Sequence, residues 1–449
     1  MAQVSVEKAR GEGGSLHVLH APVLHRDGGA VHLTLTIGNY QHVRRAYGAE
    51  IAQDALNGVH RLLAVLSYGE RIATTEAGGA IELLVRDPGA FGGGLPADAC
   101  RRWLDDVCRT MPLIPVETRA GPVHLWLGGS WAMAGDDGGG AASGSVDPRF
   151  SGDAPGDDSG WAARYRADMA LATRILSAIA VTQGAAPPAP GVMLFWQGVR
   201  DARDASSILY HEALLRLIGA HGDAISTTET VLALERLGFA RLVDHHVVSQ
   251  VIDTLESSPD VALGVNISAR SARRDSLWDE TAARLAQRPD VARRLIVEIT
   301  ETAAIPDVAA AVRFARDLRR LGCRIALDDF GNGFASIRQL FAFAPDIAKI
   351  GGFFVQRAAG SMRQRAALAH LAGLADSLGA TVIIEGVESA EQAAIASEAG
   401  GRWQQGYHWG RPSACRPWAV ADVRGGSDRA APLPPIGYDA AGARQEAAR

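Results

Sequence analysis

The sequence predicts an α/β protein in which a smaller α/β domain precedes a (β/α)8 TIM-type barrel. Strand-like and helix-like segments alternate through both halves of the chain, as they do in proteins with parallel sheets or barrels. The second half contains six short apolar runs with the length of parallel strands that are buried on both faces. The region 192–425 has the size of one such barrel.

The first domain is assigned to residues 15–182, after a flexible N-terminus at 1–14. Strand-like segments such as VHLTLTIG and IELLVRD alternate there with helical patterns near 40–66 and 97–110. An amphipathic helix at 161–180 closes the domain.

Three further segments are predicted to lack regular structure. Residues 135–160 are rich in Gly, Asp, Ser and Pro, which bury too little apolar area to offset the entropy of ordering, so they are expected to form a flexible insertion. The Pro-rich stretch 183–191 is expected to be a linker. The segment 426–449 is expected to be a disordered tail.

Bulk properties exclude several classes of protein. A net charge of −5 argues against a general nucleic-acid-binding surface. No uncharged apolar run is long enough to span a membrane, and the N-terminus lacks the apolar core of a signal peptide. The four cysteines have no zinc-site spacing, so a reduced, cytoplasmic protein is expected.

Each of the six apolar runs carries a polar or charged residue near its end. In chain order these residues are Glu212, Asn266, Glu298, the pair Asp328 and Asp329, Lys349, and Glu385. In a closed barrel, side chains from the carboxyl ends of different strands converge on one mouth. Oxygen ligands together with one ammonium group suit a divalent-metal site that acts on phosphate.

Lys349 is one of only two lysines in the chain, the other being Lys8. A lysine at the end of an apolar run is costly unless its charge is paired. A purely structural role is the alternative for Lys349, as a lysine whose ammonium reaches solvent. Other residues of the set also have structural alternatives. Asn266 could cap a turn, and Glu298 could pair with Arg294.

The ordered motifs of residues 190–425 resemble those of the EAL family of cyclic di-GMP phosphodiesterases. The matching motifs are Glu212-Ala213-Leu214 continuing to Arg216, Asn266-Ile267-Ser268, Glu298-Ile299-Thr300-Glu301, Asp328-Asp329-Phe330-Gly331, Glu385-Gly386-Val387-Glu388 and Gln405-Gly406-Tyr407. The resemblance implies hydrolysis of cyclic di-GMP to linear pGpG in bacterial second-messenger signalling. It also implies a homodimer formed through the barrel.

The same resemblance assigns roles to individual residues. It implies Mg²⁺ or Mn²⁺, as two ions, held by Glu212, Asn266, Glu298, Asp328 and Asp329. It implies catalytic roles for Lys349, Glu385 and Asp329. Leu214, Arg216 and Gln405 would bind the substrate, and Glu301 would anchor the loop after the paired aspartates.

The first domain resembles a degenerate GGDEF (diguanylate cyclase) domain. Thr36 and Gly38 stand where that family has metal-binding aspartates, and the signature turn aligns with the non-acidic segment 77–81. Without carboxylates for magnesium, we expect no cyclase activity.

One position departs from the EAL pattern. The family usually has Lys-Ile-Asp at its fifth motif, whereas this chain has Lys349-Ile350-Gly351. A second metal site without that carboxylate should bind its ion more weakly. Three hypotheses follow: an active phosphodiesterase, a non-catalytic receptor that binds cyclic di-GMP, or a hydrolase acting on a different phosphodiester.

Overall fold

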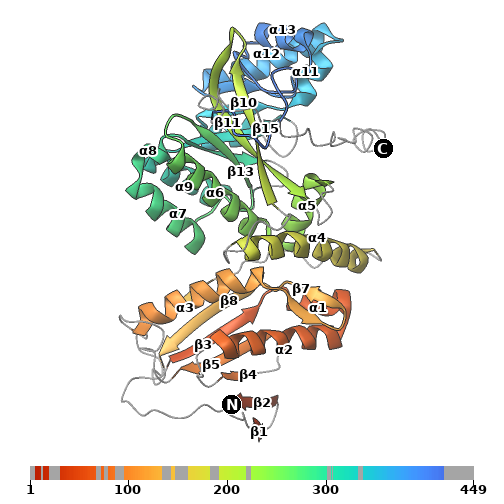
Figure 1. The fold of residues 1–449 in the computed structure, drawn as a ribbon, viewed down its shortest axis with the longest axis vertical. Helices are drawn as coiled ribbons and strands as arrows, with labels where there is room; N and C mark the ends of the chain where they lie inside the picture. The colour runs from red at the N-terminus through yellow and green to blue at the C-terminus, as the bar shows by residue number, and fades with distance from the viewer. Residues whose placement is uncertain are drawn as a thin grey trace, which may run out of the picture.

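The computed structural model shows two units stacked along the longest axis of the molecule (Figure 1). The residues it describes are 6–11, 14–19, 31–66, 72–74, 79–85, 96–133, 143–146, 160–182, 192–218, 224–300, 305, 307–331 and 337–418. Glu301, the predicted linker 183–191 and the predicted tail 426–449 lie outside this set.

The first unit is built on an antiparallel sheet. In spatial order its strands are β1 (Val6–Gly11), β2 (Gly14–Leu19), β4 (Ile72–Thr74), β5 (Ala80–Val85), β3 (Val31–Ile37), β8 (Leu127–Met133) and β9 (Ser143–Val146). The central strand β3 buries Leu33, Leu35 and Ile37, the alternate residues that face the core. The apolar pattern of the sequence therefore sets the face of this strand.

Helices α1 (Tyr40–Tyr47), α2 (Ala49–Leu66) and α3 (Pro96–Thr110) lie beside the sheet of the first unit, and α4 (Trp161–Thr182) lies between this unit and the barrel (Figure 1). A short 3-10 turn at Met111–Leu113 and a small hairpin of β6 (Val116–Thr118) and β7 (Gly121–Val123) complete the unit as described. The helix expected near 40–66 is interrupted at Gly48, whose φ of 97° few other residues adopt. The helices expected near 97–110 and 161–180 are confirmed.

Two segments expected to lack structure contain strands. Within 1–14, β1 pairs with β2, and within 135–160, β9 pairs with β8 at the edge of the sheet. Strands pair through main-chain hydrogen bonds, so a segment with little apolar content can still join a sheet. Composition measures the apolar area available for burial and does not detect this kind of pairing.

The second unit is a closed eight-stranded barrel, which confirms the predicted TIM-type architecture. Its strands are β10 (Val192–Asp201), β11 (Asp204–Ile218), β13 (Leu263–Ser268), β14 (Leu295–Thr300), β15 (Arg324–Phe330), β16 (Ile347–Ile350), β17 (Thr381–Ile384) and β18 (Trp403–Gln404), and β12 (Ala224–Ile225) extends β11. Neighbours from β11 round to β18 are parallel. Strand β10 runs antiparallel to both of its neighbours, unlike a strand of a regular (β/α)8 barrel. Only two residues join it to β11, and so tight a turn permits only the antiparallel direction.

Helices pack around the barrel. They are α5 (Thr227–Leu237), α6 (Ala240–Ser257), α7 (Ser276–Gln287), α8 (Pro289–Ala292), α9 (Val308–Leu321), α10 (Ile337–Phe343), α11 (Gly352–Ala358), α12 (Met362–Ser377) and α13 (Ala390–Glu398). Five begin at a side-chain cap, supplied by Ser226, Asp275, Asp307, Ser361 and Ser389. None of the helices in the described ranges is long and apolar enough to cross a bilayer.

The inside of the barrel is arranged in two layers. A compact apolar cluster forms the lower layer and consists of Val199, Tyr210, Ile296, Ala326, Ile347 and Ile383. Two residues after five of these six come Glu212, Glu298, Asp328, Lys349 and Glu385. Because side chains two apart on a strand share a face, these charged residues form a second layer above the apolar one. The strand period thus places the charged residues at the carboxyl mouth.

We predict that buried His124 makes the first unit sensitive to acid. Burial lowers its pKa to about 4, only partly offset by its hydrogen bond with the Pro112 carbonyl oxygen, against about 6.5 in an unfolded chain. The stabilisation from the neutral ring is therefore present above about pH 6.5 and is lost as the pH falls towards 4. The His124→Asn variant, whose side chain does not titrate, should have a lower free energy of unfolding than the parent at pH 7. This difference between variant and parent should shrink by roughly 2 kcal/mol between pH 7 and pH 4.5. Denaturant unfolding at several pH values measures this, and parallel pH profiles for the two proteins would contradict it.

Candidate metal centre at the barrel mouth

Lys349 lies at the centre of the charged layer and is completely buried. Its Nζ lies 3.1 Å from Glu212 Oε2, 2.6 Å from Glu298 Oε2, 3.2 Å from Asp328 Oδ1 and 2.7 Å from Glu385 Oε1. Four acids that are far apart in the sequence therefore lie within ion-pair distance of the same ammonium group. One ammonium faces four carboxylates, so the mouth carries a strong excess of negative charge.

Two amides complete the cluster on the side of Glu212. Asn266 Nδ2 donates a hydrogen bond of 2.5 Å to Glu212 Oε1, and Gln405 Nε2 donates one of 2.6 Å to Glu212 Oε2. Among the described residues, Asn266 Oδ1 and Glu298 Oε1 are buried without a hydrogen-bond donor. Oxygen atoms that are buried and unsatisfied in this way are costly, and a bound cation would satisfy them.

The excess of negative charge perturbs the acids of the cluster. Burial, reinforced by the charges of Glu212 and Asp328, raises the pKa of Glu298 to about 8 despite the nearby lysine. Burial and the charges of neighbouring carboxylates raise the pKa of Asp328 to about 6 and that of Glu385 well above its usual range. Burial is the largest cause of each shift, and the nearby lysine offsets it only in part.

Glu212 and Lys349 are the two members of the cluster whose charged forms are favoured. Burial acts to raise the pKa of Glu212, but the charge of Lys349 and the hydrogen bonds from Gln405 and Asn266 lower it. Burial acts to lower the pKa of Lys349, but the surrounding carboxylates raise it well above its usual value. The ion pair between them is thus the fixed element around which the other acids lie.

The arrangement fits a divalent cation. One oxygen from each of Glu212, Glu298 and Asp328 lies within 4.8 Å of the other two. Carboxylate oxygens, with the amide oxygen of Asn266 beside them, suit Mg²⁺ or Mn²⁺ better than softer metals. The geometry therefore brings together four of the residues predicted from the sequence as metal ligands.

The remaining residues predicted from the sequence are Asp329, Leu214, Arg216 and Glu301. Asp329 directly follows Asp328 and adopts a φ of 53°, unusual for a residue other than glycine, while its N–H donates to Asp328 Oδ1. Leu214 and Arg216 are half-buried and share the face of β11 with Glu212, further along the strand. Glu301 lies outside the described residues.

Two features of the site were not predicted from the sequence. Gln197 on β10 accepts a hydrogen bond from Gln405 through Oε1 and donates through Nε2 to the Gly410 carbonyl oxygen. Gly264 leaves the space that Glu298 needs, because a Cβ added there would lie 2.1 Å from Glu298 Oε1 and 2.6 Å from Tyr210 Cε2. A lone polar residue in the apolar run VMLFWQG was the only sequence signal for Gln197.

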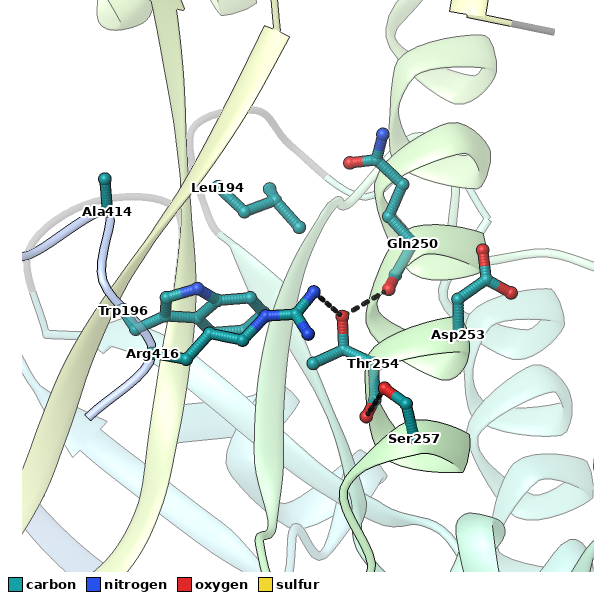
Figure 2. Close-up of a pocket in the computed structure, with 8 residues that line it drawn as sticks. All are labelled: Leu194, Trp196, Gln250, Asp253, Thr254, Ser257, Ala414 and Arg416. Atoms are coloured by element: carbon teal, nitrogen blue, oxygen red, sulfur yellow. Dashed lines mark hydrogen bonds between the residues drawn. The ribbon is translucent and has the colours of Figure 1, made fainter. Parts of the chain in front are cut away.

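A separate cavity of about 510 Å³ lies outside the barrel, between β10, α6 and the segment 414–416. Figure 2 shows its lining residues, Leu194, Trp196, Gln250, Asp253, Thr254, Ser257, Ala414 and Arg416. Thr254 accepts from Arg416 and donates to the Gln250 carbonyl oxygen, so these polar groups satisfy one another. The cavity contains no member of the carboxylate cluster and is not the candidate centre.

We predict that Gly264→Ala weakens metal binding without unfolding the barrel. The added methyl group would displace the Glu298 carboxylate, and misplacing one ligand should lower Mn²⁺ affinity by about 10-fold or more. Gly373→Ala on helix α12 is the matched control, because no atom lies within 4 Å of a Cβ added at Gly373. Calorimetric titration with Mn²⁺ measures both variants, and equal affinities would contradict the assigned role of Gly264.

Curated relatives match about half of the chain. The chain is 29% identical to the cyclic di-GMP phosphodiesterase PdeF of Escherichia coli over 208 residues, which is 45% of this chain and 28% of PdeF. It is 27% identical to the cyclic di-GMP phosphodiesterase RocR of Pseudomonas aeruginosa over 215 residues, which is 47% of this chain and 55% of RocR. The matches thus cover about a quarter to about half of the length of these relatives.

Solved structures match half or more of the chain. An EAL domain protein from Listeria monocytogenes is 24% identical and matches 54% of this chain and 94% of that chain, with a TM-score of 0.47. The S helix-GGDEF-EAL structure of LapD from Vibrio cholerae is 17% identical and matches 85% of this chain and 89% of that chain, with a TM-score of 0.48.

The family of the chain follows from its match to a family model. The model of the EAL domain matches residues 187–412, which is half of the chain and includes every strand of the barrel. The EAL resemblance noted in the sequence is thereby confirmed, and the chain belongs to the EAL domain family.

Proposed function

We propose that the barrel hydrolyses cyclic di-GMP to linear pGpG, as a phosphodiesterase of bacterial second-messenger signalling. The observation that carries this proposal is the buried cluster of four carboxylates around Lys349. Membership of the EAL family supports it, as does the similarity to proteins named as cyclic di-GMP phosphodiesterases.

The proposed metal ligands are Glu212, Asn266, Glu298 and Asp328, with Asp328 and Asp329 serving a second ion. The unsatisfied oxygens of Asn266 and Glu298 support this assignment. Two divalent ions, Mg²⁺ or Mn²⁺, would neutralise phosphoryl charge and lower the pKa of the attacking water. Glu385 would lie beside the second ion, and its carboxylate contacts Lys349.

The protein would orient the substrate with groups that lie around this cluster. Lys349 supplies a fixed positive charge for the phosphoryl oxygens as negative charge develops on them. The guanidinium of Arg216 is well shaped to bind the other phosphate, and Leu214 and Gln405 would flank the dinucleotide. Leu214 and Arg216 lie on the same face of β11 as Glu212, which supports this assignment.

The reaction requires one water molecule. Its oxygen forms a bond to phosphorus, the bond from phosphorus to the ribose 3′ oxygen breaks, and the leaving oxygen takes up a proton. The product is a linear dinucleotide with a 5′ phosphate and a free 3′ hydroxyl. Glu385, which contacts Lys349 at the mouth and is not among the proposed metal ligands, would be the group that takes up and returns such a proton.

A second candidate function is a receptor that binds cyclic di-GMP without cleaving it. Gly351 favours it, because this position offers no carboxylate for a second ion. The nearby Asp346 is no replacement, since its Oδ2 accepts hydrogen bonds from Arg319 and from the Ile325 N–H at the opposite end of the strands.

Two further proposals concern the rest of the molecule. The first unit would be a GGDEF-like domain without cyclase activity, because Thr36 and Gly38 offer no carboxylate for magnesium. The barrel would form homodimers, for which the exposed apolar side chains Ile337, Phe341 and Phe353 offer a contact surface. Glu301 would anchor the loop that follows Asp329.

We predict that Glu212→Ala abolishes hydrolysis of cyclic di-GMP. This change removes a proposed metal ligand and the nearest partner of two amides, so turnover should fall on the order of 100-fold or more. Glu398→Ala, at an exposed site on α13, is the matched control. Chromatographic separation of pGpG from cyclic di-GMP after incubation with Mg²⁺ or Mn²⁺ measures the rate. If calorimetry shows that the parent protein binds cyclic di-GMP but no pGpG is formed, the enzyme hypothesis is wrong and the receptor hypothesis is supported.

We predict that Gly351→Asp raises the rate of hydrolysis several-fold. Gly351 caps α11 with a φ of −60° and a ψ of 151°, a conformation open to any residue and favourable for aspartate at a helix N-cap. The new carboxylate should strengthen binding of the second ion. Gly360→Asp adds the same charge where no atom lies within 4 Å of the new Cβ, and it should leave the rate unchanged. A fall in rate for Gly351→Asp in folded protein would show that the missing carboxylate is not what limits turnover.

A further inference from the structure

The first unit contacts the barrel at several places, one of which is the corner formed by the turn between α5 and α6. Trp126 is buried there, and its Nε1 donates a hydrogen bond of 3.1 Å to the Leu237 carbonyl oxygen. Its ring stacks on Phe239 with centroids 5.2 Å apart and planes 9° apart, and the guanidinium of Arg241 lies 5.0 Å from its centroid. A side chain of the first unit is thus part of the core around this corner.

An ion pair holds the same corner from α4, which lies along α5 (Figure 1). Arg236 donates two hydrogen bonds to Asp168, of 2.7 Å from Nε and 2.6 Å from Nη2. The Asp168 side chain is only 7% exposed, so solvent screens this two-point contact weakly. Together with Trp126 it fixes both the position and the direction of the corner.

The two helices that meet at this corner also hold the strand end that carries Asn266. Ser268, two residues after Asn266, donates from Oγ to Glu235 of α5 at 2.7 Å and from its N–H to Asp244 of α6 at 2.9 Å. Ser271 Oγ donates to the same oxygen of Asp244. Both helices therefore bond the same short segment at the carboxyl end of β13.

We infer that Trp126 and Asp168 of the first unit are positioning residues for the metal centre proposed above, and that they act through the α5–α6 corner. They fix α5 and α6, these helices fix Ser268 through Glu235 and Asp244, and Ser268 fixes the register of Asn266 against Glu212. Each step is a direct contact between packed or hydrogen-bonded groups. The inference depends on the proposed function for the role of Asn266, but the connection from Trp126 to Ser268 does not.

Hydrogen exchange of the metal-free full chain tests this connection. Trp126→Ala should increase the exchange rate of the Ser268 amide by about 5-fold or more, while β17 at the opposite side of the barrel keeps its protection. Trp126→Phe keeps a stacked ring but loses the N–H donor, so it should give a smaller increase. Arg109→Ala removes exposed ion pairs with Asp106 and with Glu280, the second of which crosses the same interface, and should change nothing. Unchanged exchange at Ser268 in folded Trp126→Ala would overturn the inference.

Titration with Mn²⁺ then tests whether the connection reaches the metal centre. Trp126→Ala and Ser268→Ala should each weaken Mn²⁺ binding by about 5-fold, and the double variant should lose no more than one of them alone, because both changes break the same path. Losses that multiply in the double variant would overturn the inference. A parent protein that binds no Mn²⁺ would contradict the proposed metal centre instead, and the exchange result would still decide the connection to Ser268.

Discussion

The contact of one buried ammonium with four carboxylates is the constraint on which the rest of the barrel depends. Lys349 lies within 3.2 Å of an oxygen of each acid, and its own charge is the only one of its sign in the charged layer. Buried charges require close, opposite partners, and here the partners outnumber the lysine. The cluster is therefore stable as a set of charges only when protons or cations complete it, and a bound metal ion would do so.

The remainder of the barrel interior is arranged so that this cluster can exist. Below it lies the hydrophobic cluster, with one residue from each of six strands, which keeps water from the underside of the acids. Tyr210 fills the space that Gly264 leaves, and Glu298 lies against both. Gln197 and Gln405 link Glu212 to the antiparallel strand that closes the barrel. The same interior thus combines tight packing below with unsatisfied oxygen atoms above, a combination that stability alone would not favour.

The residues of the centre could be predicted because each is a polar residue within or directly after an otherwise apolar run. A polar residue at the end of an apolar run is conspicuous in the sequence, and Glu212, Glu298 and Lys349 all follow this pattern. Gln197 was missed because the direction of its strand depends on a two-residue turn and on closure of the sheet. The strands β1 and β9 were missed because pairing at an edge depends on backbone groups, which every residue carries.

The sequence by itself determined the barrel class, the order of its strands and the residues that face its mouth, since a period of two along each strand fixes which side chains point inward. Only the tertiary structure decided the distances between those residues, the closure by an antiparallel strand and the seating of the first unit on the α5–α6 corner. Contacts such as those of Lys349 with Glu212, or of Trp126 with Phe239, join residues more than a hundred positions apart. Their geometry depends on how the strands close and how the two units pack, which no local pattern specifies.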